Sequence, residues 1–269
     1  MMMETDSIQI KSEGPVLHVT LDRPEKYNAM NLAIWEGLWN ATRKFAADAS
    51  LRVMLVTARG KYFSAGIDLH GPLVPDPAIT DSPLAFRQWY REGIGSLHGL
   101  GDEWEAIGKP IVVAHQGPCL GGALEISLCA DFRLAAASAS YQLPEIELGG
   151  IPGSGGTSRL VRTVGPHWAR WMILANKQIG AGQALAIGLV HDVYLDERFD
   201  KEVQNFCRLL AQKPPEAYAI GKLAIELAAD LDRAQGRNVE RIAVSQIVLG
   251  DEYKAMLAAV QARLTKKKT

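Results

Sequence analysis

The order of hydrophobic and polar residues at the start of the chain has the period of two that is typical of β-strands. Residues 7–11 (SIQIK) and 16–21 (VLHVTL) alternate in this way, and Asp22-Arg23-Pro24 ends the pattern. Residues 32–48 then change to a helical period, and Asn31 is suited to cap that helix. We therefore expect two strands followed by an amphipathic helix. The apolar face of this helix is expected to carry Ile34, Leu38 and Phe45.

Strands and helices alternate in the following part of the chain. Continuous apolar runs predict buried strands at residues 52–58, 109–117 and 131–137. A helix is expected at 121–130, and from Thr157 onward the pattern is mostly helical, with one strand at 188–194. Pro214-Pro215 separates two of these later helices. Alternation of this kind predicts an α/β fold with a parallel or mixed sheet, followed by an α-helical extension.

Other segments are less regular. Residues 71–83, rich in proline and aspartate, are expected to form a surface loop before a helical stretch from Phe86 to Leu100, and residues 141–156 form a glycine-rich connection. Near the end of the chain, helices around 217–229 and 239–249 have broad apolar faces. These faces pack either against other subunits or against the domain's own core, and the sequence leaves both possibilities open.

The composition is that of a globular protein with a substantial core. Of 269 residues, 48% are hydrophobic and 22% are charged, and a net charge of −1 gives no general attraction for nucleic acid. Cys119, Cys129 and Cys207 are widely separated in apolar surroundings, which predicts reduced core thiols and no disulfide. The N-terminus lacks the apolar core of a signal peptide. We expect a cytoplasmic protein that binds neither nucleic acid nor membranes.

Several familiar motifs are incomplete in this sequence. The segment IPGSGGTS (151–158) has no GKS or GKT ending, Ser158 occupies the last glycine position of GxGxxG, and Pro152 stands where a GxSxG elbow needs glycine. The six histidines form no HExxH pattern and have no cysteine partners at zinc spacing. We therefore expect no phosphate loop, no serine nucleophile and no metal site.

Three loops, each following a predicted strand, carry unusual residues. The first, second and third loops are residues 63–69 (FSAGIDL), 117–125 (GPCLGGALE) and 143–156 (LPEIELGGIPGSGG). Ligands bind at the carboxyl ends of strands in an open α/β sheet, so we expect the loops to meet. Glycine at positions 66, 121 and 122 lets the backbone approach a ligand closely or adopt a positive φ. A helix beginning near Gly122 directs free N–H groups toward an oxygen that gains negative charge.

Two glutamates belong to these loops. Glu125 is the only charged residue in the apolar segment 119–130, and Glu145 follows Pro144, which restricts the direction of the chain. Two carboxyl groups at one site can serve as an acid and a base if their surroundings separate their pKa values. A structural interpretation also stands at this point, with a helix N-terminal glutamate favoured by the dipole and an ordinary glutamate in a surface loop.

Four segments together resemble a known family. DRPEKYNAMN, FSAGIDL, GPCLGGALEISLCADFRLA and PEIELGGIPGSGGTSRL, in this order and spacing, are similar to the enoyl-CoA hydratase/isomerase (crotonase) superfamily, closest to enoyl-CoA hydratase. The resemblance implies an α/β fold of the crotonase type, with repeated ββα units in residues 1–195. It also implies a helical C-terminal trimerisation region in residues 196–269 and assembly into homotrimers or homohexamers.

The resemblance implies a role for each matching residue. The backbone N–H groups of Ile67 and Gly122 would form an oxyanion hole for a thioester enolate. Glu125 would hold and deprotonate a water that adds to C3 of a trans-2-enoyl-CoA, and Glu145 would deliver a proton to C2. The product would be a 3-hydroxyacyl-CoA, the S isomer by the same resemblance. Coenzyme A is part of the substrate, and no separate cofactor or metal ion is implied.

Coenzyme A contacts follow from the same resemblance. The segment RPEKYNAM is similar to the family's adenine-side loop, so Arg23 and Lys26 are candidates for the phosphates and Ala29 is a backbone neighbour of the pantetheine or adenine. As an alternative, Arg23 and Lys26 are ordinary exposed cations. The tail KKK (266–268) is a further candidate, for a neighbouring subunit's coenzyme A. Further contacts are expected from Ala65, Gly66, Asp68, Leu69, His70 and Gly121.

The acyl group is left open by departures from the family pattern. Gln142 stands where hydratases commonly have glycine, and residues 71–96, where the family varies with its substrate, show no pattern that identifies an acyl chain. Alternative reactions are Δ3,Δ2-enoyl-CoA isomerisation through Glu145 alone and hydration of a branched or aromatic acyl-CoA. A non-catalytic acyl-CoA-binding or RNA-binding scaffold is disfavoured by the intact glutamate pair, and RNA in particular by the net charge.

Overall fold

The computed structural model describes residues 7–71, 73–92 and 97–266. Two compact units are present, one formed by Met1–Glu105 with Pro110–Ala211 and the other by Ala106–Lys109 with Gln212–Thr269. The sequence placed this boundary after residue 195. Helix α8 (Asp196–Ala211) belongs instead to the first unit, because its apolar face packs against the sheet of that unit.

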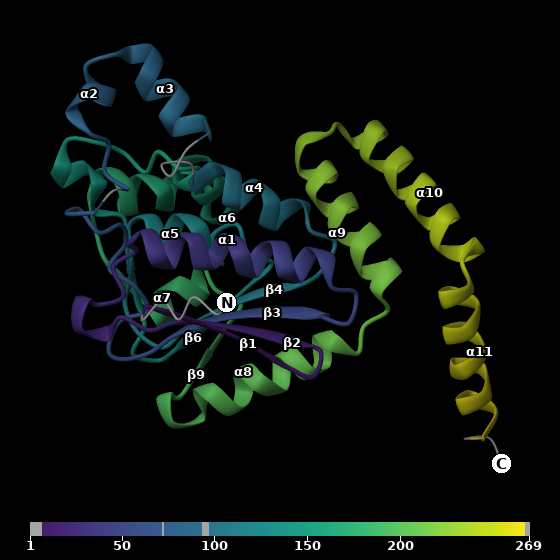
Figure 1. Cartoon of the computed structure of the whole chain (residues 1–269). Helices are drawn as coiled ribbons and strands as arrows, with labels where there is room; N and C mark the ends of the chain where they lie inside the picture. The colour runs from purple at the N-terminus through teal and green to yellow at the C-terminus, as the bar shows by residue number, and fades with distance from the viewer. Residues whose placement is uncertain (1–6, 72, 93–96, 267–269) are drawn as a thin grey trace. The chain divides into compact units, whose positions relative to one another are not determined.

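A six-stranded sheet forms the centre of the first unit (Figure 1). The spatial order of its strands is β1-β2-β3-β4-β6-β9; β1 and β2 are antiparallel, and all other neighbours are parallel. This is the mixed sheet that the alternation of strands and helices predicts. The strands span Ile8–Glu13 (β1), Val16–Leu21 (β2), Val53–Ala58 (β3), Ile111–His115 (β4), Phe132–Ala136 (β6) and Asp192–Tyr194 (β9).

Helix α1 (Leu32–Ala47) covers one face of this sheet (Figure 1). Asn31 caps it as expected, because its side chain accepts a hydrogen bond from the N–H of Ile34 at 2.9 Å. Ile34, Leu38 and Phe45 are all buried, which confirms the predicted apolar face. Burying a side chain of this size contributes about 1.5–3 kcal/mol, so this face accounts for much of the helix's attachment.

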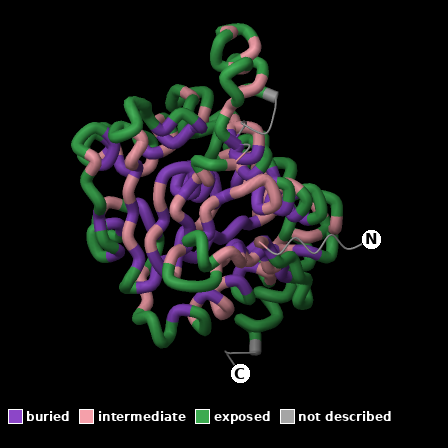
Figure 2. The backbone as a smooth tube through the Cα atoms, turned by 60° about the vertical axis from the view of Figure 1, so that its left-hand side comes forward, coloured by how far each residue is buried: buried purple, intermediate pink, exposed green. Residues whose placement is uncertain are grey.

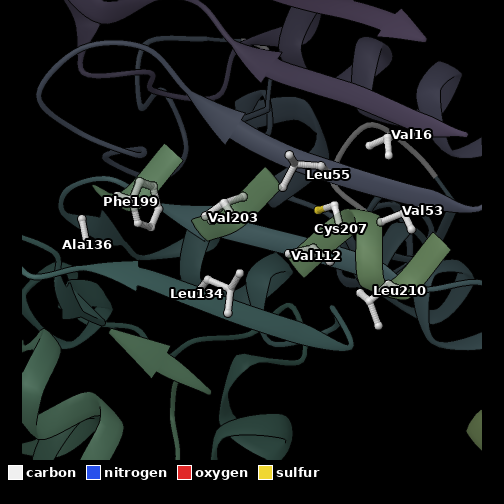
Figure 3. Packing of buried hydrophobic residues seen from close by; sticks show 11 residues of the cluster. Val16, Val53, Leu55, Val112, Leu134, Ala136, Phe199, Val203, Cys207 and Leu210 are labelled. Carbon is white, nitrogen blue, oxygen red and sulfur yellow. The ribbon is translucent and has the colours of Figure 1, made fainter. Parts of the chain in front are cut away.

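Helix α8 covers the opposite face of the sheet (Figure 1). Its buried side chains recur every three or four residues and pack against strands β2, β3, β4 and β6, as Figure 3 shows. With both faces covered, the parallel strands are nearly continuous in their apolar character, which explains why they are recognisable in the sequence. The helix contributes Phe199, Val203, Cys207 and Leu210 to this core.

Buried residues gather in the interior of the fold, while the surrounding chain is exposed (Figure 2). Cys119, Cys129 and Cys207 are all buried and free of disulfides, as predicted. Burial raises the pKa of each of these thiols, which makes them unreactive core residues. Within the described ranges, no helix is both long enough and apolar enough to cross a membrane.

A second, three-stranded sheet supports the functional loops, and the sequence did not predict it. Strands of two or three residues are too short to show a period. β5 lies parallel to β7, which pairs antiparallel with β8, and the 3₁₀ helix η2 (Pro144–Leu148) follows β7 and carries Glu145. A bridge between Ser64 and Cys119 joins this sheet to the first loop. The strands span Cys119–Leu120 (β5), Ser140–Gln142 (β7) and Ile179–Gly180 (β8).

The segment before β4 contains more helix than the sequence predicts. The expected surface loop 71–83 includes the short helix α2 (Pro77–Thr80), and two helices occupy the stretch expected as one, α3 (Pro83–Glu92) and α4 (Leu97–Ala106). Residues 72 and 93–96 of this predicted variable region lie outside the described residues. The remaining helical elements of this unit are η1 (Pro24–Lys26), α5 (Gly122–Ser127), α6 (Gly156–Ala169), the π-helical turn η3 (Arg170–Leu174) and α7 (Ala181–Ala186).

The second unit is helical. Its helices are α9 (Pro215–Asp230), α10 (Arg233–Leu249) and α11 (Asp251–Lys266). Asp232 caps α10 by accepting hydrogen bonds from the N–H groups of Ala234 and Gln235 at 2.8 and 2.9 Å. Large apolar side chains remain exposed on these helices, so packing within the unit does not bury their apolar faces. Examples are Leu223, Ile225, Ile242 and Leu249.

Candidate active site

The first loop is held in place by the chain at Met30. The N–H of Met30 donates to the carbonyl of Gly66 at 2.8 Å, and the N–H of Asp68 donates to the carbonyl of Met30 at 3.0 Å. In a parallel bridge, both of these bonds lie on one side of the intervening residue, which here is Ile67. The N–H of Ile67 is therefore directed away from Met30, and it has no hydrogen-bond acceptor among the described residues.

The second loop approaches the first so closely that glycine is required. A Cβ on Gly66, whose φ is +94°, would lie 2.9 Å from the carbonyl oxygen of Leu120 and 3.4 Å from the nitrogen of Gly122. A Cβ on Gly122 would lie 3.0 Å from Cγ1 of Ile67. Gly121 also has a positive φ, of +53°. The segments that carry the N–H groups of Ile67 and Gly122 are thus in contact, as the sequence led us to expect.

Glu125 lies in the first turn of α5, and its side chain is fixed at one oxygen. Oε2 accepts hydrogen bonds from the backbone N–H groups of Ser154 at 2.7 Å and Gly156 at 2.9 Å. Burial raises the pKa of Glu125 to about 7; the charge of Glu145 raises it too, while the two N–H groups and Arg159 lower it. A carboxyl group with this pKa can gain or lose a proton near neutral pH, which suits a general acid or base.

Glu145 follows Pro144 at the start of η2 and reaches back to the second loop. A Cβ on Gly121 would lie only 3.0 Å from Oε1 of Glu145. Oε2 is buried and has no hydrogen-bond partner in the part of the chain that the structure describes, and burial raises the pKa of this carboxyl group. Buried acceptors without donors are uncommon and are often functional. The charge of Glu145 also raises the pKa of Glu125, which indicates that the two carboxyl groups lie near each other.

This arrangement supplies two kinds of chemistry. Backbone N–H groups without acceptors can stabilise an oxygen that becomes negative, and they do so most strongly where water is excluded. Two carboxyl groups with raised pKa values can exchange protons with carbons or with a water molecule close to that oxygen. The site is therefore suited to a reaction in which a carbonyl compound passes through an enolate while a proton moves on and off a neighbouring carbon.

The predicted coenzyme A contacts fall into two groups. Lys26, Leu69 and His70 are exposed. Arg23 and Asp68 are only partly exposed and form an ion pair, with Nη1 of Arg23 at 2.6 Å from Oδ2 of Asp68. The arginine holds the pKa of the Asp68 carboxyl group below its usual value, and the hydrogen bond between the two side chains is the largest cause. The guanidinium group predicted to meet a phosphate thus contacts the first loop.

The adenine-side loop (residues 23–30) and the first loop are joined by further backbone contacts. Arg23 also donates from Nη1 to the carbonyl of Ala29 at 3.1 Å. The N–H of Ala65 donates to the carbonyl of Tyr27 at 2.9 Å. Hydrogen bonds therefore join the two loops that carry Arg23, Ala29, Ala65 and Asp68.

The sequence did not identify the residues that surround Glu125 from the third loop and from α3. A Cβ on Gly156 would lie 2.5 Å from Cγ of Glu125, and a Cβ on Gly153 would lie 2.6 Å from the hydroxyl oxygen of Tyr90. This hydroxyl lies 3.5 Å from Oγ of Ser154. The glycines of IPGSGG are the signal in the sequence that could have revealed these neighbours. Gly153 leaves space for Tyr90, and Gly156 leaves space for Glu125.

Two more polar residues have partners that the sequence did not reveal. Arg159 is bound by Glu105 at 2.6 Å and by Asp102 at 2.7 Å, so its charge is shared with these carboxylates. Gln142 donates to the side-chain oxygen of Asn176 at 2.9 Å and to its backbone carbonyl at 3.2 Å, which fixes the end of β7 before η2. Of the tail lysines, 267 and 268 lie outside the described residues, as does the side chain of 266.

Comparisons with known proteins match this fold and site. A family profile described as enoyl-CoA hydratase/isomerase matches residues 11–267. The chain is 32% identical to the 2,3-dehydroadipyl-CoA hydratase of Escherichia coli (strain K12), over 86% of both chains. It is also 32% identical to the carnitinyl-CoA dehydratase of Salmonella arizonae, over 86% of this chain and 85% of the relative. The crystal structure of an enoyl-CoA hydratase from Bacillus anthracis matches with a TM-score of 0.85 and 28% identity over 96% of both chains.

Fold and loop geometry together define a protein of the crotonase superfamily. The chain belongs to the enoyl-CoA hydratase/isomerase family, as the motifs in its sequence indicated.

Proposed function

We propose that this protein is an enoyl-CoA hydratase that adds water across the 2,3 double bond of a trans-2-enoyl-CoA. The observation that carries the proposal is the fixation of Glu125, whose Oε2 is occupied by two backbone N–H groups. This leaves the other oxygen to bind and orient a water molecule. The names of two relatives, a hydratase and a dehydratase, support a reaction in which water is added or lost.

The proposed reaction uses four groups. The N–H groups of Ile67 and Gly122 bind the thioester carbonyl and stabilise the enolate; losing one such donor costs roughly 10²–10³ in rate. Glu125 takes a proton from the water as its oxygen bonds to C3. Glu145 delivers a proton to C2, so that one water is added in total and the two carboxyl groups exchange protonation states. General acid–base help of this kind contributes roughly 10²–10⁴ for each group.

Product analysis tests the proposal. Purified protein is incubated with crotonyl-CoA and with a medium-chain 2-enoyl-CoA, and the product is analysed by mass spectrometry. We expect the gain of one water and a 3-hydroxyacyl-CoA. Conversion of a 3-enoyl-CoA to a 2-enoyl-CoA without a change in mass, and its survival in Glu125→Ala, would instead indicate an isomerase that uses Glu145 alone.

We also propose that the exposed apolar side chains of α9, α10 and α11 pack between copies of the chain in a homotrimer or homohexamer. Their exposure on helices of the second unit supports this assembly. Size-exclusion chromatography with light scattering gives the mass in solution. A monomer at micromolar concentration would contradict the proposal.

A further inference from the structure

We infer that Arg23 is a positioning residue for the oxyanion hole, because its ion pair with Asp68 connects the adenine-side loop to the first loop. The inference rests on the proposed function and deepens it. It assigns to Arg23 a role in orienting the N–H of Ile67, in place of a direct contact with a phosphate of coenzyme A.

The first support is the position of the ion pair. Asp68 is the residue directly after Ile67, and its carboxylate has a partner at each oxygen. Oδ2 is bound by Nη1 of Arg23 at 2.6 Å, and Oδ1 accepts the N–H of His70 at 3.1 Å. The side chains of Arg23 and Asp68 are only 19% and 18% exposed, so solvent screens their attraction weakly. The pair therefore restrains Asp68, the residue that follows Ile67, while the N–H of Met30 binds the Gly66 carbonyl in the peptide plane that carries the Ile67 N–H.

The second support is a buried network on the other side of the same loop. Asn28 is fully buried with a φ of +52°, and its side chain accepts the backbone N–H of Arg23 at 2.8 Å. The hydroxyl of Ser64 donates to the carbonyl of Asn28 at 2.8 Å and accepts the N–H of Gly66 at 3.2 Å. The N–H of Gly66, which precedes Ile67, is thus bound by Ser64, and the N–H of Asp68 is bound by the carbonyl of Met30.

These contacts have a consequence for catalysis. Ile67 lies between two residues whose N–H groups are fixed, and both fixations lead back to the adenine-side loop. Loss of the ion pair would therefore loosen the donor that acts on the thioester, whether or not the substrate carries a nucleotide, and such a loss lowers kcat. A direct phosphate ligand would contribute to binding of the nucleotide and leave the enolate unaffected.

The two roles predict different kinetics. In Arg23→Met, we expect kcat to fall by about 10-fold or more, toward the roughly 10²–10³ that a lost oxyanion donor costs. The fall should be equal for crotonyl-CoA and crotonyl-pantetheine, which lacks the nucleotide, with each KM changed less than about threefold. Arg23→Lys should restore part of kcat because its ammonium group can still pair with Asp68. A rise in KM confined to crotonyl-CoA, with kcat unchanged, would overturn the inference and make Arg23 a phosphate ligand.

A matched control and a second variant keep the test independent of folding. Arg59 forms a similar ion pair with Asp22 at 2.8 Å, but its side chain is 57% exposed and lies outside the site, so Arg59→Met should keep kcat within about twofold. Asp68→Asn, which keeps the shape of the side chain, should lower kcat like Arg23→Met. Equal losses in Arg59→Met would show a general effect on the fold and would contradict the inference.

A readout that does not need hydration separates this inference from the proposed function. Acetoacetyl-CoA forms an enolate that absorbs in the near ultraviolet, so the bound enolate fraction reports on the oxyanion hole directly. Wild type and Arg59→Met should bind the enolate, and Arg23→Met and Asp68→Asn should lose most of the enolate band. If wild type shows the band but hydrates no enoyl-CoA, the proposed function fails while the positioning role holds. If the Arg23 and Asp68 variants keep the full band, or wild type forms none, the positioning role is wrong.

Discussion

The backbone N–H of Ser154 donates to Oε2 of Glu125 at 2.7 Å, and together with the N–H of Gly156 it joins the third loop to helix α5. This relationship gives the Glu125 side chain a fixed orientation. The side chain is almost completely buried. The relationship also works against the rise in pKa that burial causes, so that the carboxyl group titrates near neutrality and does not remain protonated.

Glu125→Gln is expected to stabilise the fold at alkaline pH. The pKa of about 7 in the folded state lies above the ordinary value of 4.5. Between these values the folded state holds a proton that the unfolded state has lost, so the free energy of unfolding falls as the pH rises through this window. The loss amounts to about 3 kcal/mol, and glutamine, which does not titrate, avoids it.

Urea denaturation of wild type and Glu125→Gln at pH 5 and pH 8 measures this effect. The variant should gain stability relative to wild type between the two pH values, while the amide oxygen still accepts the N–H groups of Ser154 and Gly156. An equal difference between the two proteins at both pH values would show that Glu125 has an ordinary pKa.

The activity should depend on pH in the same range. In the proposed hydration Glu125 is the base and must be ionised, so kcat/KM is expected to fall about tenfold per unit as the pH drops below about 7. Initial rates with crotonyl-CoA from pH 5 to pH 9 test the profile. A rate that stays constant down to pH 5 is incompatible with Glu125 as the base.

Gly156→Ala should disturb Glu125 without changing any catalytic atom. The new Cβ would lie 2.5 Å from Cγ and 2.7 Å from Oε2 of Glu125, so the carboxylate must move. We expect kcat to fall by about 10-fold or more, since misplacement of this order costs up to about 10²-fold. Gly182→Ala in α7 is the control, because its Cβ meets no atom within 4 Å. Similar kinetics for both variants would show that the contact with Gly156 is unimportant.

Tyr90→Phe should change the preference for acyl chains. The Tyr90 hydroxyl lies beside the third loop, 3.5 Å from Oγ of Ser154, and its removal takes away a polar group next to this loop. We expect the ratio of kcat/KM for a medium-chain 2-enoyl-CoA over crotonyl-CoA to rise by about 3–10-fold, within the roughly 1–3 kcal/mol cost of burying a polar group unpaired. Tyr194→Phe on β9 is the matched control. An unchanged ratio in Tyr90→Phe would place the acyl chain elsewhere.

Local patterns in the sequence predicted most of the first unit because both faces of its sheet are covered. Such strands have apolar runs long enough to recognise, and the loops that follow parallel strands are brought to one edge, which is why Gly66, Gly122 and Glu145 were found as one group. The strands β5, β7 and β8 escaped detection because two or three residues cannot show a period.

The partners of polar residues were the part that sequence could not provide. Arg23 and Asp68 are 45 positions apart, and each looks like an ordinary charged residue until the bridge at Met30 brings them together. Likewise, nothing near Glu125 in the chain indicates that the N–H groups of Ser154 and Gly156 will bind it. Almost every residue has a backbone N–H, so the residue type does not show which N–H groups act as donors.

The most direct test of this account is the absorbance of crotonyl-CoA after addition of wild type and of Glu125→Gln at equal concentrations. We predict that wild type removes the absorbance band of the conjugated enoyl thioester and that the variant, though folded, is slower by roughly 10²-fold or more. Retention of more than about a tenth of the wild-type rate by Glu125→Gln would contradict the central claim that Glu125 activates the water.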